Sequence, residues 1–551
     1  MAIPVLLFVI ALAVRAGSAA LFSEPAYPDS YYYVNVARAL ASGSGFSVDY
    51  IWNFVDVGGV LPNDGRLPVP SNAHWMPLAA IVQVPFIWAL GANPLASGLP
   101  FWLAAAAVAP LTYAIARDAA LERWQAAAAG LLVAFPGFVA PYLGQPDNFG
   151  LYMLLGALAL WLCARALRGD ARALALGGLV VGLAFLSRND GLLLGIPYAL
   201  VFLAGRIRPT RFERIGWLPA LLCLGLFLLV VAPWLLRQVA VFGSLSPSAA
   251  SGRILWISEY RELYSVSTET TLASFLAQGA GDIAWSRLGG LAFALFVFGG
   301  MPLLFMLVPF LAVGFWQRRR DGAFAPWAIY AVALFIFTAV VSAVHVPYGT
   351  FLHSAVALLP HAYILALVGL ATVVGTIAAR RPSWDVVRAS RHISMMMVGV
   401  VIAAAVVATW LTSHAWARER DGRTEVLATL QAVATEGDRV MSPDAGAYRY
   451  RGGWSGIVTP DDPLPVVKDA LDRYGVRWLA LEAAHITRAL LPVLEGGERP
   501  TWLSEPLVEV YSPDARTGAD AEDVGRVGQR NVPRAALYAV CLDPHYDRCA
   551  T

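Results

Sequence analysis

The sequence predicts a polytopic α-helical membrane protein with a small C-terminal α/β domain. Of its 551 residues, 58% are hydrophobic and 14% are charged, whereas soluble domains carry about 25% charged residues. Apolar runs recur up to residue 412, and a membrane-spanning helix needs roughly 20 such residues. Beyond residue 412 charged residues become frequent, and short strand-like runs replace the apolar ones.

Eleven apolar runs are predicted to cross the membrane, because each approaches the length that a membrane-spanning helix needs. They are residues 3–22, 98–117, 124–142, 149–166, 173–187, 191–205, 215–236, 287–315, 325–344, 351–377 and 393–412. The first run has no basic residues ahead of it and no small-residue cleavage site behind it. We therefore expect a retained signal anchor rather than a cleaved signal peptide.

The distribution of charged residues decides whether a further apolar run, residues 78–91, crosses the membrane. If this run does not cross, the arginine-rich loops all fall on one side of the membrane, which the positive-inside rule assigns to the cytoplasm. These loops are Arg117–Arg123, Arg165–Arg172, Arg206–Arg214, Arg318–Arg320 and Arg380–Arg391. We therefore assign residues 78–91 to a juxtamembrane or re-entrant helix. The N-terminus is then cytoplasmic and the C-terminus lies outside.

Two domains are predicted. Residues 1–412 form the membrane domain, whose first outer loop, 23–97, holds juxtamembrane helices. Residues 413–551 form an outer domain of a common size. Its α/β character is indicated by strand-like runs at 439–441, 476–481, 507–511 and 535–541 and by a helical stretch at 464–474.

The four cysteines are of two kinds. Cys163 and Cys223 lie in apolar runs and are expected to pack as small hydrophobic side chains. Cys541 and Cys549 flank a turn-forming Asp-Pro pair, so a disulfide between them is expected in an oxidising exterior. A frayed terminus with two free thiols is the alternative.

The first candidate for chemistry is Asp29, which follows the first apolar run in the segment PDSYYY. A carboxylate at the mouth of a helical bundle can serve as a base. Residues 29–42 are amphipathic, which suits a helix that lies on the membrane with the acid at its N-terminus. The alternative is that Asp29 only caps this helix.

Two further polar clusters end apolar runs on the predicted outer side. Asp147 and Asn148 lie in a Pro-Asp-Asn turn, which alone is more often structural but beside Asp29 indicates a site partner. Arg188 and Asp190 lie in the sequence SRNDG. A guanidinium there can hold an anionic head group bidentately, or it can extend to the interface as long cations do at the ends of spans.

Histidine and tyrosine side chains repeat this pattern at the outer boundary. They are His74, His345, Tyr348 and His353. Each can donate a hydrogen bond to an anion. A single interfacial histidine is more often structural, which is the alternative for each of them.

Several function classes are excluded. The net charge of +2 gives no concentrated basic face, so no nucleic-acid partner is expected. The sequence has no Walker-type loop, no GxSxG, no HExxH and no paired CxxC, which argues against nucleotide hydrolases, serine hydrolases and zinc enzymes of those types.

The first apolar run and the four segments after it resemble the GT-C superfamily of polytopic glycosyltransferases, nearest to its protein O-mannosyltransferase and aminoarabinose-transferase branch. The segments are PDSYYYVNVARALASGSGF, HWMPLA, GQPDNFGLY and GLAFLSRNDGLLL. The likeness continues more loosely in HVPYGTFLHSAVALLP and in the tail segments RVMSPDAGAYRY and YGVRWLALE.

This resemblance implies an inverting glycosyltransferase that moves a sugar from a polyprenyl-phosphate carrier to an acceptor hydroxyl on the outer face of the membrane. Asp29 would be the base, Asp147 matches the second-loop acid and Arg188 matches the cation after the fifth span. The other residues assigned to substrate and phosphate binding are His74, Asn148, Asp190, His345, Tyr348 and His353. The expected partners are the lipid-linked donor, a glycan, lipid or protein acceptor, and the bilayer of a prokaryotic plasma membrane.

The chemistry leaves the cofactor open. A lipid phosphate is a competent leaving group, so such an enzyme needs one base and cations that stabilise the departing phosphate. A divalent cation, Mg²⁺ or Mn²⁺, held by Asp29 and Asp147 is the other solution. Two alternative functions are a metal-dependent enzyme of the oligosaccharyltransferase type and a polytopic lipid or solute transporter. The transporter would be expected to show repeated halves with paired broken helices.

Overall fold

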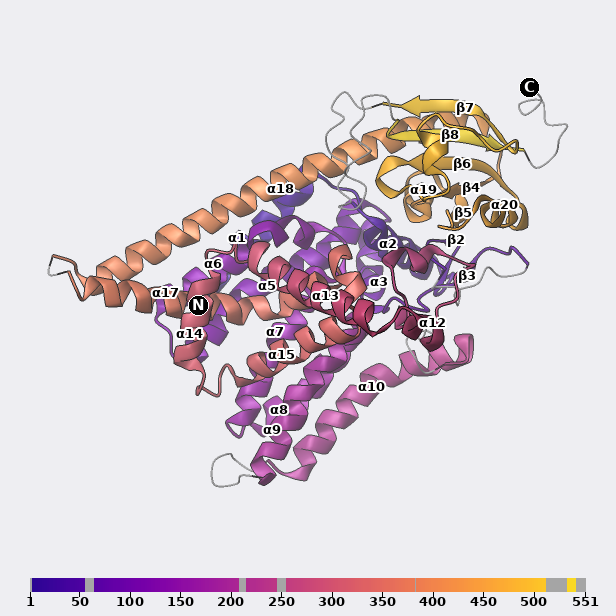
Figure 1. Cartoon of the computed structure of the whole chain (residues 1–551). Coiled ribbons are helices and arrows are strands. Elements are labelled where there is room, and N and C mark those ends of the chain that lie inside the picture. Colours follow the sequence, from indigo (N-terminus) through magenta and orange to yellow (C-terminus); the bar gives the residue numbers. More distant parts are fainter. Residues whose placement is uncertain are drawn as a thin grey trace. The chain divides into compact units, whose positions relative to one another are not determined.

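The structure is a computed structural model and describes residues 2–54, 64–207, 215–244, 254–381, 383–511 and 533–541. Most elements are helices, and one six-stranded sheet lies within the described residues (Figure 1). The chain divides into two compact units. Unit 1 is built from Met1–Glu24, Met76–Arg237 and Gly279–Ser413, and unit 2 from Pro25–Trp75, Gln238–Gln278 and His414–Thr551.

Unit 1 is helical. Its α-helices are α1 (Ala2–Leu21), α3 (Leu78–Ile81), α4 (Val84–Leu90), α5 (Pro94–Asp118), α6 (Arg123–Ala134), α7 (Asn148–Leu167), α8 (Ala171–Ser187), α9 (Gly195–Ile207), α13 (Ala280–Gly300), α14 (Val308–Arg318), α15 (Ala325–Val340), α16 (Thr350–Ala355) and α17 (Leu359–Ala378). Short 3-10 helices join them: η1 (Gly137–Gly144), η2 (Asn189–Leu194), η4 (Ala343–Tyr348) and η5 (Val356–Leu358). Two long helices, α10 (Trp217–Phe242) and α18 (Val386–Val433), begin in unit 1 and end in unit 2.

Every apolar run that was predicted to cross the membrane contains a helix. Within the described residues, 8 helices are long and apolar enough to cross, and the bent pair α6 and η1 would be a further span. Two more of the predicted runs form shorter helices, α8 with 17 residues and α15 with 16. The run at 78–91 forms the short helices α3 and α4. The protein is therefore a multi-pass integral membrane protein.

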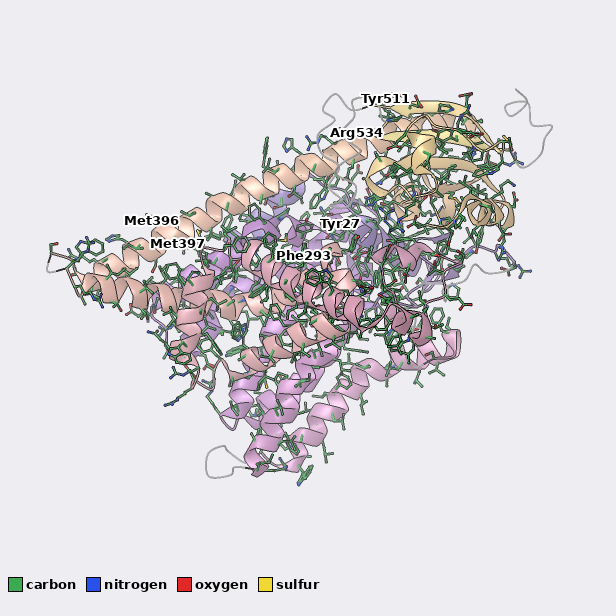
Figure 2. All side chains as sticks on the ribbon, in the orientation of Figure 1. Tyr27, Phe293, Met396, Met397, Tyr511 and Arg534 are labelled. Atoms are coloured by element: carbon green, nitrogen blue, oxygen red, sulfur yellow. The ribbon has the colours of Figure 1, made fainter. Side chains whose placement is uncertain are left out.

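The long helices expose apolar side chains, as lipid-facing helices do. On α18, Met396 is 64% exposed, and Figure 2 shows it together with Met397 on that helix. On α10, Leu229 and Leu236 are each 69% exposed. Soluble proteins rarely expose large contiguous apolar surfaces, so these faces are consistent with contact to lipid.

One predicted span, 287–315, is not continuous. The chain leaves the helical path after α13 and resumes it at α14, with Leu304 and Phe305 at positive φ values of 51° and 56°. Carbonyl groups freed at this break find tertiary partners, since Met301 O accepts from Phe138 N at 2.8 Å and Pro302 O accepts from Tyr363 Oη at 2.8 Å. Pro302 also disfavours an uninterrupted helix. Periodicity alone could not indicate these distant partners.

The predicted span 124–142 is bent by 61° between α6 and η1. Arg15 of α1 is only 1% exposed, and it donates to Ala140 O at 2.9 Å and to Ala134 O. Carbonyl groups at a broken helix have no water to bind within a membrane, so another donor must satisfy them. The buried Arg15 therefore holds the bend, a role that the sequence did not predict.

Helix α7 packs closely on its neighbours because two of its positions are glycines. A Cβ atom on Gly150 would lie 2.8 Å from Ala105 Cβ on α5, and one on Gly156 would lie 2.3 Å from Ala357 Cβ on η5. Small residues allow helix backbones in membranes to approach closely. These two contacts fix α7 between α5 and the α16–η5 segment.

Unit 2 contains the six-stranded sheet, with strand order β2-β5-β4-β6-β8-β7. Its strands are β2 (Tyr50–Ile51), β4 (Arg439–Ser442), β5 (Ser455–Val458), β6 (Val476–Glu482), β7 (Leu503–Val510) and β8 (Ala535–Val540). The pairs from β2 to β6 are parallel, and β8 pairs antiparallel with both β6 and β7. A small antiparallel pair, β1 (Ser47–Val48) with β3 (Val69–Pro70), lies apart from this sheet.

The C-terminal part of α18 covers this sheet. Val426 and Leu430 of α18 are fully buried, in one hydrophobic cluster with Val440 of β4, Trp478 of β6 and Leu537 of β8. Figure 1 shows α19 (Ala445–Gly452) and α20 (Leu464–Arg473) beside the strands. Four predicted strands and the predicted helix at 464–474 are confirmed.

Strands β2 and β5 and helix α19 are among the elements of unit 2 that the sequence analysis did not predict. Strand β2 comes from the first predicted outer loop and pairs in parallel with β5, with Ile51 opposite Ile457. Part of that loop therefore belongs to the same compact unit as the C-terminal residues. Pairing between such distant segments leaves no local pattern.

Helix α2 (Pro28–Ala41) corresponds to the predicted amphipathic stretch, and its residues Ser30–Ala37 are all buried. Other parts of unit 2 cover it: Asn35 Nδ2 donates to Gly446 O at 2.9 Å, and the ring of Tyr32 lies 5.2 Å from that of Trp52. Tyr27 is the N-cap, so Asp29 is in the first turn and does not cap the helix.

The cysteine predictions are only partly tested. Cys163 is buried and Cys223 is half-buried, and both are free thiols. The expected bridge from Cys541 to Cys549 lies outside the described residues, because the description ends at residue 541.

Candidate active site

The site in unit 1 begins at the N-terminus of α7. Asp147 is the N-cap of this helix, in an extended conformation with φ −146°, and its Oδ1 accepts from Asn148 N at 2.5 Å. Asp147 is only 1% exposed. Capping by an aspartate is favourable because the backbone N–H groups at a helix N-terminus need acceptors. The cap uses one carboxylate oxygen and leaves Oδ2 for a second contact.

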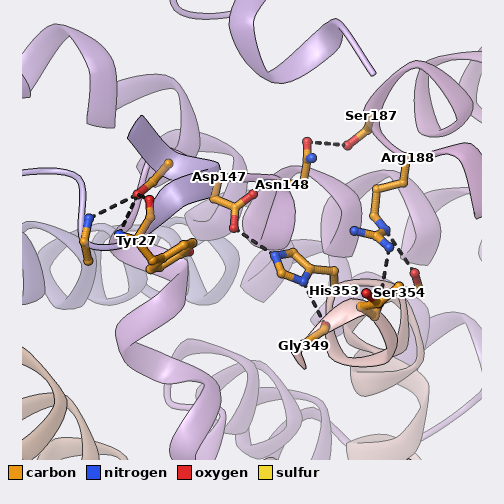
Figure 3. Close-up of polar contacts among 11 residues, drawn as sticks. Tyr27, Asp147, Asn148, Ser187, Arg188, Gly349, His353 and Ser354 are labelled. Atoms are coloured by element: carbon orange, nitrogen blue, oxygen red, sulfur yellow. Dashed lines mark hydrogen bonds and ion pairs between the residues drawn. The ribbon is translucent and has the colours of Figure 1, made fainter. Parts of the chain in front are cut away.

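That second contact is to His353 of α16. The Oδ2 atom of Asp147 lies 2.9 Å from Nε2 of His353, and Nδ1 of the same ring lies 2.9 Å from Gly349 O (Figure 3). The ring of Phe149 stacks on the imidazole with a centroid distance of 3.8 Å. Residues far apart in the sequence thus form one fixed pair in a largely buried place.

The geometry of this pair constrains its protons. Both ring nitrogens of His353 face oxygen atoms that accept hydrogen bonds. A neutral imidazole has a single N–H and can donate to only one of them. With an ionised Asp147, both contacts are donor bonds only when the ring carries two protons. Two arrangements satisfy both contacts. Either protonated Asp147 donates to a neutral imidazole, or an ionised Asp147 forms an ion pair with a doubly protonated His353.

Arg188 lies at the end of α8 and is held by three groups. Its Nε donates to Asp190 Oδ1 at 3.1 Å and to Ser354 Oγ at 3.0 Å, and one terminal nitrogen donates to Thr350 O at 3.2 Å (Figure 3). Ser354 Oγ in turn donates to Asp190 Oδ2. The guanidinium is therefore fixed in orientation and partly neutralised, rather than extended as a mobile cation toward an interface.

Further hydrogen bonds join the helices around these groups. Asn148 Oδ1 accepts from Ser187 Oγ at 3.0 Å, which links α7 to the end of α8 (Figure 3). Tyr330 Oη of α15 lies 3.1 Å from Tyr152 Oη and donates to Ser354 O at 3.3 Å. The segment that carries His353 is thereby connected to α7, α8 and α15.

The structure brings five of the predicted site residues into this arrangement: Asp147, Asn148, Arg188, Asp190 and His353. His345 and Tyr348 lie nearby in the sequence, in η4. Burial and the positive charge of Arg287 lower the pKa of His345 to about 4, so this ring is neutral at pH 7 and does not supply a cation. Tyr348 is 40% exposed at the end of η4.

Two predicted residues belong to unit 2. Asp29 is half-buried in the first turn of α2, beside Ser30, whose Oγ accepts from Tyr27 N at 3.2 Å. His74 stacks against Trp75 with a centroid distance of 3.9 Å.

The sequence reading missed several residues of the site. They are Phe149, Ser187 and Ser354, together with the tyrosine pair Tyr152 and Tyr330. Each of the first three is adjacent to a predicted residue, in PDNF, LSRND or LHSA. A polar or aromatic neighbour of a candidate residue, at the same end of an apolar run, was the available signal.

The ligand atoms of this site bear on the choice of metal. Asp147 and His353 offer a carboxylate oxygen and an imidazole nitrogen. That combination suits Zn²⁺ or Mn²⁺, whereas Mg²⁺ prefers oxygen ligands alone. Two side chains are fewer than the roughly four ligands that Zn²⁺ takes, so the pair would have to share an ion with other groups.

One comparison with known proteins concerns the sequence. Residues 77–236 match the family described as dolichyl-phosphate-mannose-protein mannosyltransferase. The matched segment contains Asp147 and Arg188. No curated protein matches the chain.

Two solved structures have a similar fold. ArnT from Cupriavidus metallidurans in the apo state has a TM-score of 0.52 at 13% sequence identity, covering 97% of this chain and 97% of that chain. The oligosaccharyltransferase from Archaeoglobus fulgidus, in complex with Zn and sulfate, has a TM-score of 0.51 at 14% identity, covering 92% of this chain and 72% of that chain.

These findings confirm the predicted resemblance to the GT-C superfamily and its mannosyltransferase and ArnT-like branch. They support the fold class of a helical membrane protein with a small sheet region.

Proposed function

We propose that this protein is a glycosyltransferase of the GT-C type, which moves a sugar from a polyprenyl-phosphate carrier to an acceptor hydroxyl with inversion at the anomeric carbon. The observation that carries the proposal is the fixed constellation of Asp147, His353 and Arg188 in unit 1. It joins a carboxylate, a proton-sharing imidazole and a guanidinium at the ends of apolar helices, where a lipid phosphate and a polar sugar can both be bound.

The proposed reaction is a single displacement. The acceptor oxygen attacks the anomeric carbon, the bond from that carbon to the phosphate oxygen breaks, and a carboxylate takes the proton of the acceptor hydroxyl. The electron pair of the broken bond stays on the phosphate. One displacement inverts the anomeric configuration, and no general acid is needed because the phosphate leaves as a stable anion.

Arg188 would stabilise the charge on the departing phosphate. Its guanidinium is already oriented by Asp190, Ser354 and Thr350 O, so little reorganisation accompanies the reaction. The imidazole of His353, when it carries two protons, adds positive charge beside it. Asn148, His74, His345 and Tyr348 are proposed to contribute contacts to the substrate.

Asp29 is the proposed base, and Asp147 its partner. This assignment rests on the resemblance of the segment PDSYYY to the first loop of the superfamily. Asp147 is engaged by the helix N-terminus and by His353, which suits the role of a partner to the base.

The description of the matched family supports a polyprenyl-phosphate donor, since dolichyl-phosphate-mannose is such a compound. The acceptor would be a hydroxyl on a glycan, lipid or protein. The predicted one-sided arginine loops support a site on the outer face of the membrane, and the membrane is proposed to be a prokaryotic plasma membrane.

The test is turnover by the purified protein in detergent with a panel of polyprenyl-phosphate sugars, read as release of the sugar-free lipid phosphate. Asp29→Asn should lower turnover by about 10²–10⁴-fold, because it removes a base of almost unchanged volume. Asp385→Asn is the matched control, since its carboxylate is 56% exposed and forms an ion pair with an exposed arginine. Wild-type turnover in Asp29→Asn would refute the assignment of the base.

A metal-dependent enzyme of the oligosaccharyltransferase type is the second candidate. It is favoured by the oxygen and nitrogen ligands of Asp147 and His353 and by the similar fold of the archaeal oligosaccharyltransferase in complex with Zn. Treatment with a chelator distinguishes the two candidates. Turnover that falls on chelation and returns with Mn²⁺ or Zn²⁺ would favour the metal, and unchanged turnover would favour the metal-free displacement.

A further inference from the structure

A continuous set of aromatic rings lies in unit 2. The ring of Trp52 lies 5.2 Å from that of Tyr32 and 5.2 Å from that of Trp75. The ring of Trp75 in turn lies 3.9 Å from that of His74, tilted by 47°. All four residues belong to the segment Pro25–Trp75 of unit 2. Two of the rings, Tyr32 and Trp52, are 0% and 6% exposed.

Three polar atoms at this cluster are shielded from solvent. Among the residues that the structure describes, the indole N–H groups of Trp52 and Trp75 have no acceptor, and Oε1 of Gln238 has no donor. Gln238, also in unit 2, is 0% exposed. Buried indole N–H groups usually find a partner, and one left without a partner is unfavourable. Two donors and one acceptor are therefore available to a polar ligand.

Asn72 forms hydrogen bonds with three residues of this cluster. Its backbone N–H donates to Tyr32 Oη at 2.7 Å, its carbonyl accepts from Gln238 Nε2 at 2.8 Å, and its Nδ2 donates to Trp75 O at 3.0 Å. Its φ of +62° lies in the left-handed region, which costs free energy for any residue but glycine. Strained backbone of this kind is concentrated at ligand clamps and other functional sites.

We propose that this cluster, formed by Tyr32, Trp52, His74, Trp75 and Gln238, is a saccharide-binding subsite. A sugar has C–H faces that pack on aromatic rings and hydroxyl groups that both donate and accept. The unpartnered atoms match this pattern, since the indole N–H groups would donate to hydroxyl oxygens and Gln238 Oε1 would accept from a hydroxyl. Ligand sites are commonly aromatic with a few placed polar groups.

This inference rests on the proposed function, because that function supplies the sugar. Two sources share this chemistry: the sugar of the lipid-linked donor and a sugar of the acceptor. An ordered water is the plain alternative, since one water could accept from an indole and donate to the amide. The experiment must therefore separate the donor, the acceptor and water.

The substitutions Trp52→Phe and Trp75→Phe remove only the indole N–H and part of the ring, so an aromatic face is kept. Gln238→Met removes the acceptor. Trp285→Phe is the matched control, because Trp285 is 78% exposed and belongs to unit 1. Thermal unfolding of each full-length variant in detergent checks the fold. If one variant does not fold, the test uses the other two.

Two binding measurements use defined probes. The first compares a short-chain polyprenyl phosphate with the same lipid phosphate carrying a hexose, an N-acetylhexosamine or an aminopentose. The second uses the methyl glycosides of the same three sugars. We expect wild type to prefer at least one sugar-loaded lipid or one glycoside. Each Phe variant should reduce that preference about three- to tenfold, the effect of losing one hydrogen bond, without changing the affinity for the bare lipid phosphate.

The outcomes are distinct. A change confined to the loaded lipids assigns the subsite to the donor, and one confined to the glycosides assigns it to the acceptor. Equal affinity of wild type for loaded and bare lipid together with no glycoside binding overturns the inference. Unchanged preferences in folded variants also overturn it and favour the water. The binding measurements do not depend on turnover. A failure of the Asp29 test would therefore refute the assigned base without changing the result for the saccharide-binding subsite.

Discussion

Asp147 and His353 show how much of this protein depends on single side chains. Asp147 caps α7 with one oxygen and binds His353 with the other, and Phe149 fixes the plane of the imidazole. Each of the two side chains thus fixes the orientation of the other and affects its protonation. Such mutually dependent residues act as a unit, and their substitutions are not additive.

A double-mutant cycle tests this dependence. We expect Asp147→Asn and His353→Gln each to lower turnover by about 10²-fold, and the double variant to lose far less than the product of the two. His392→Gln, an exposed histidine on α18, is the matched control. Turnover of the double variant that equals the product of the single effects would show that the two residues act independently.

A second group of coupled residues lies in unit 2. Arg423 binds Glu482 through two hydrogen bonds of 2.8 and 2.6 Å and lies 3.6 Å from Asp444, and all three side chains are at most 10% exposed. Removing one member of such a buried pair costs about 3–5 kcal/mol, because the other charge is left unpaired.

We therefore expect Arg423→Leu and Glu482→Leu each to lower the thermal midpoint of the protein in detergent by several degrees. The double variant should lose less than Arg423→Leu, because only Asp444, and not Glu482 as well, is then left without the guanidinium. Arg388→Leu is the control, since Arg388 is 82% exposed in its pair with Asp385 and should cost under about 1 kcal/mol. A double variant less stable than both single variants would contradict this account.

The same pair predicts an acid sensitivity. Burial by itself would raise the pKa of Glu482, but the charge and hydrogen bonds of Arg423 outweigh it and bring the pKa below 4.5. The stabilisation is therefore complete above pH 4.5 and is lost as the pH falls through the folded-state value. Burial raises the pKa of Asp444, so its protonation opposes this loss. Glu482→Gln should flatten the fall of the thermal midpoint between about pH 5 and pH 3; an unchanged slope would contradict the assignment.

At the scale of elements, the site depends on how closely α7 approaches the α16–η5 segment. Asp147 is the N-cap of α7, and His353 lies in α16. Further along α7, Gly156 lies against Ala357 of η5. Since packed helices do not deform freely, a methyl group at Gly156 must push the two segments apart.

We expect Gly156→Ala to lower turnover about tenfold or more while the protein stays folded, because small displacements of reacting groups are costly. Adding Ala357→Gly should restore part of the activity by removing the opposing methyl group. Gly399→Ala on α18 is the matched control, since a Cβ there meets nothing within 4 Å. Equal loss in the rescue variant and in Gly156→Ala would show that spacing is not the cause.

At the scale of the whole molecule, the distribution of arginines predicts the sidedness of the chain. The loop at Arg318–Arg320 should be cytoplasmic, and the C-terminal residues should lie outside. The expected outer site then meets lipid-linked substrates on the outer face.

Cysteine labelling of intact cells with an impermeant maleimide checks this topology. In a background in which Cys163 and Cys223 are replaced by alanine, Tyr511→Cys should be labelled at once, and Arg319→Cys only after permeabilisation. Both positions are exposed, and the parent without an added cysteine is the control. Labelling of both positions from the same side would contradict the predicted topology.

The sequence by itself determined the features that composition encodes locally. Apolar runs predicted the helices of the membrane portion, because a lipid environment requires about 20 apolar residues per span. Strand-like runs predicted β4, β6, β7 and β8. Polar residues at the ends of apolar runs, such as Asp147, Arg188 and His353, were recognisable because polar groups in such places are costly without a function.

Only the tertiary structure decided which of these residues meet. The contact of Asp147 with His353 joins residues 206 positions apart, the pairing of β2 with β5 joins an early loop to the tail, and Arg15 satisfies carbonyl groups at a bend far along the chain. The break between α13 and α14 likewise depends on hydrogen-bond donors from η1 and α17. Local sequence patterns indicate whether a residue is buried. Which distant residue it contacts depends on how the whole chain folds.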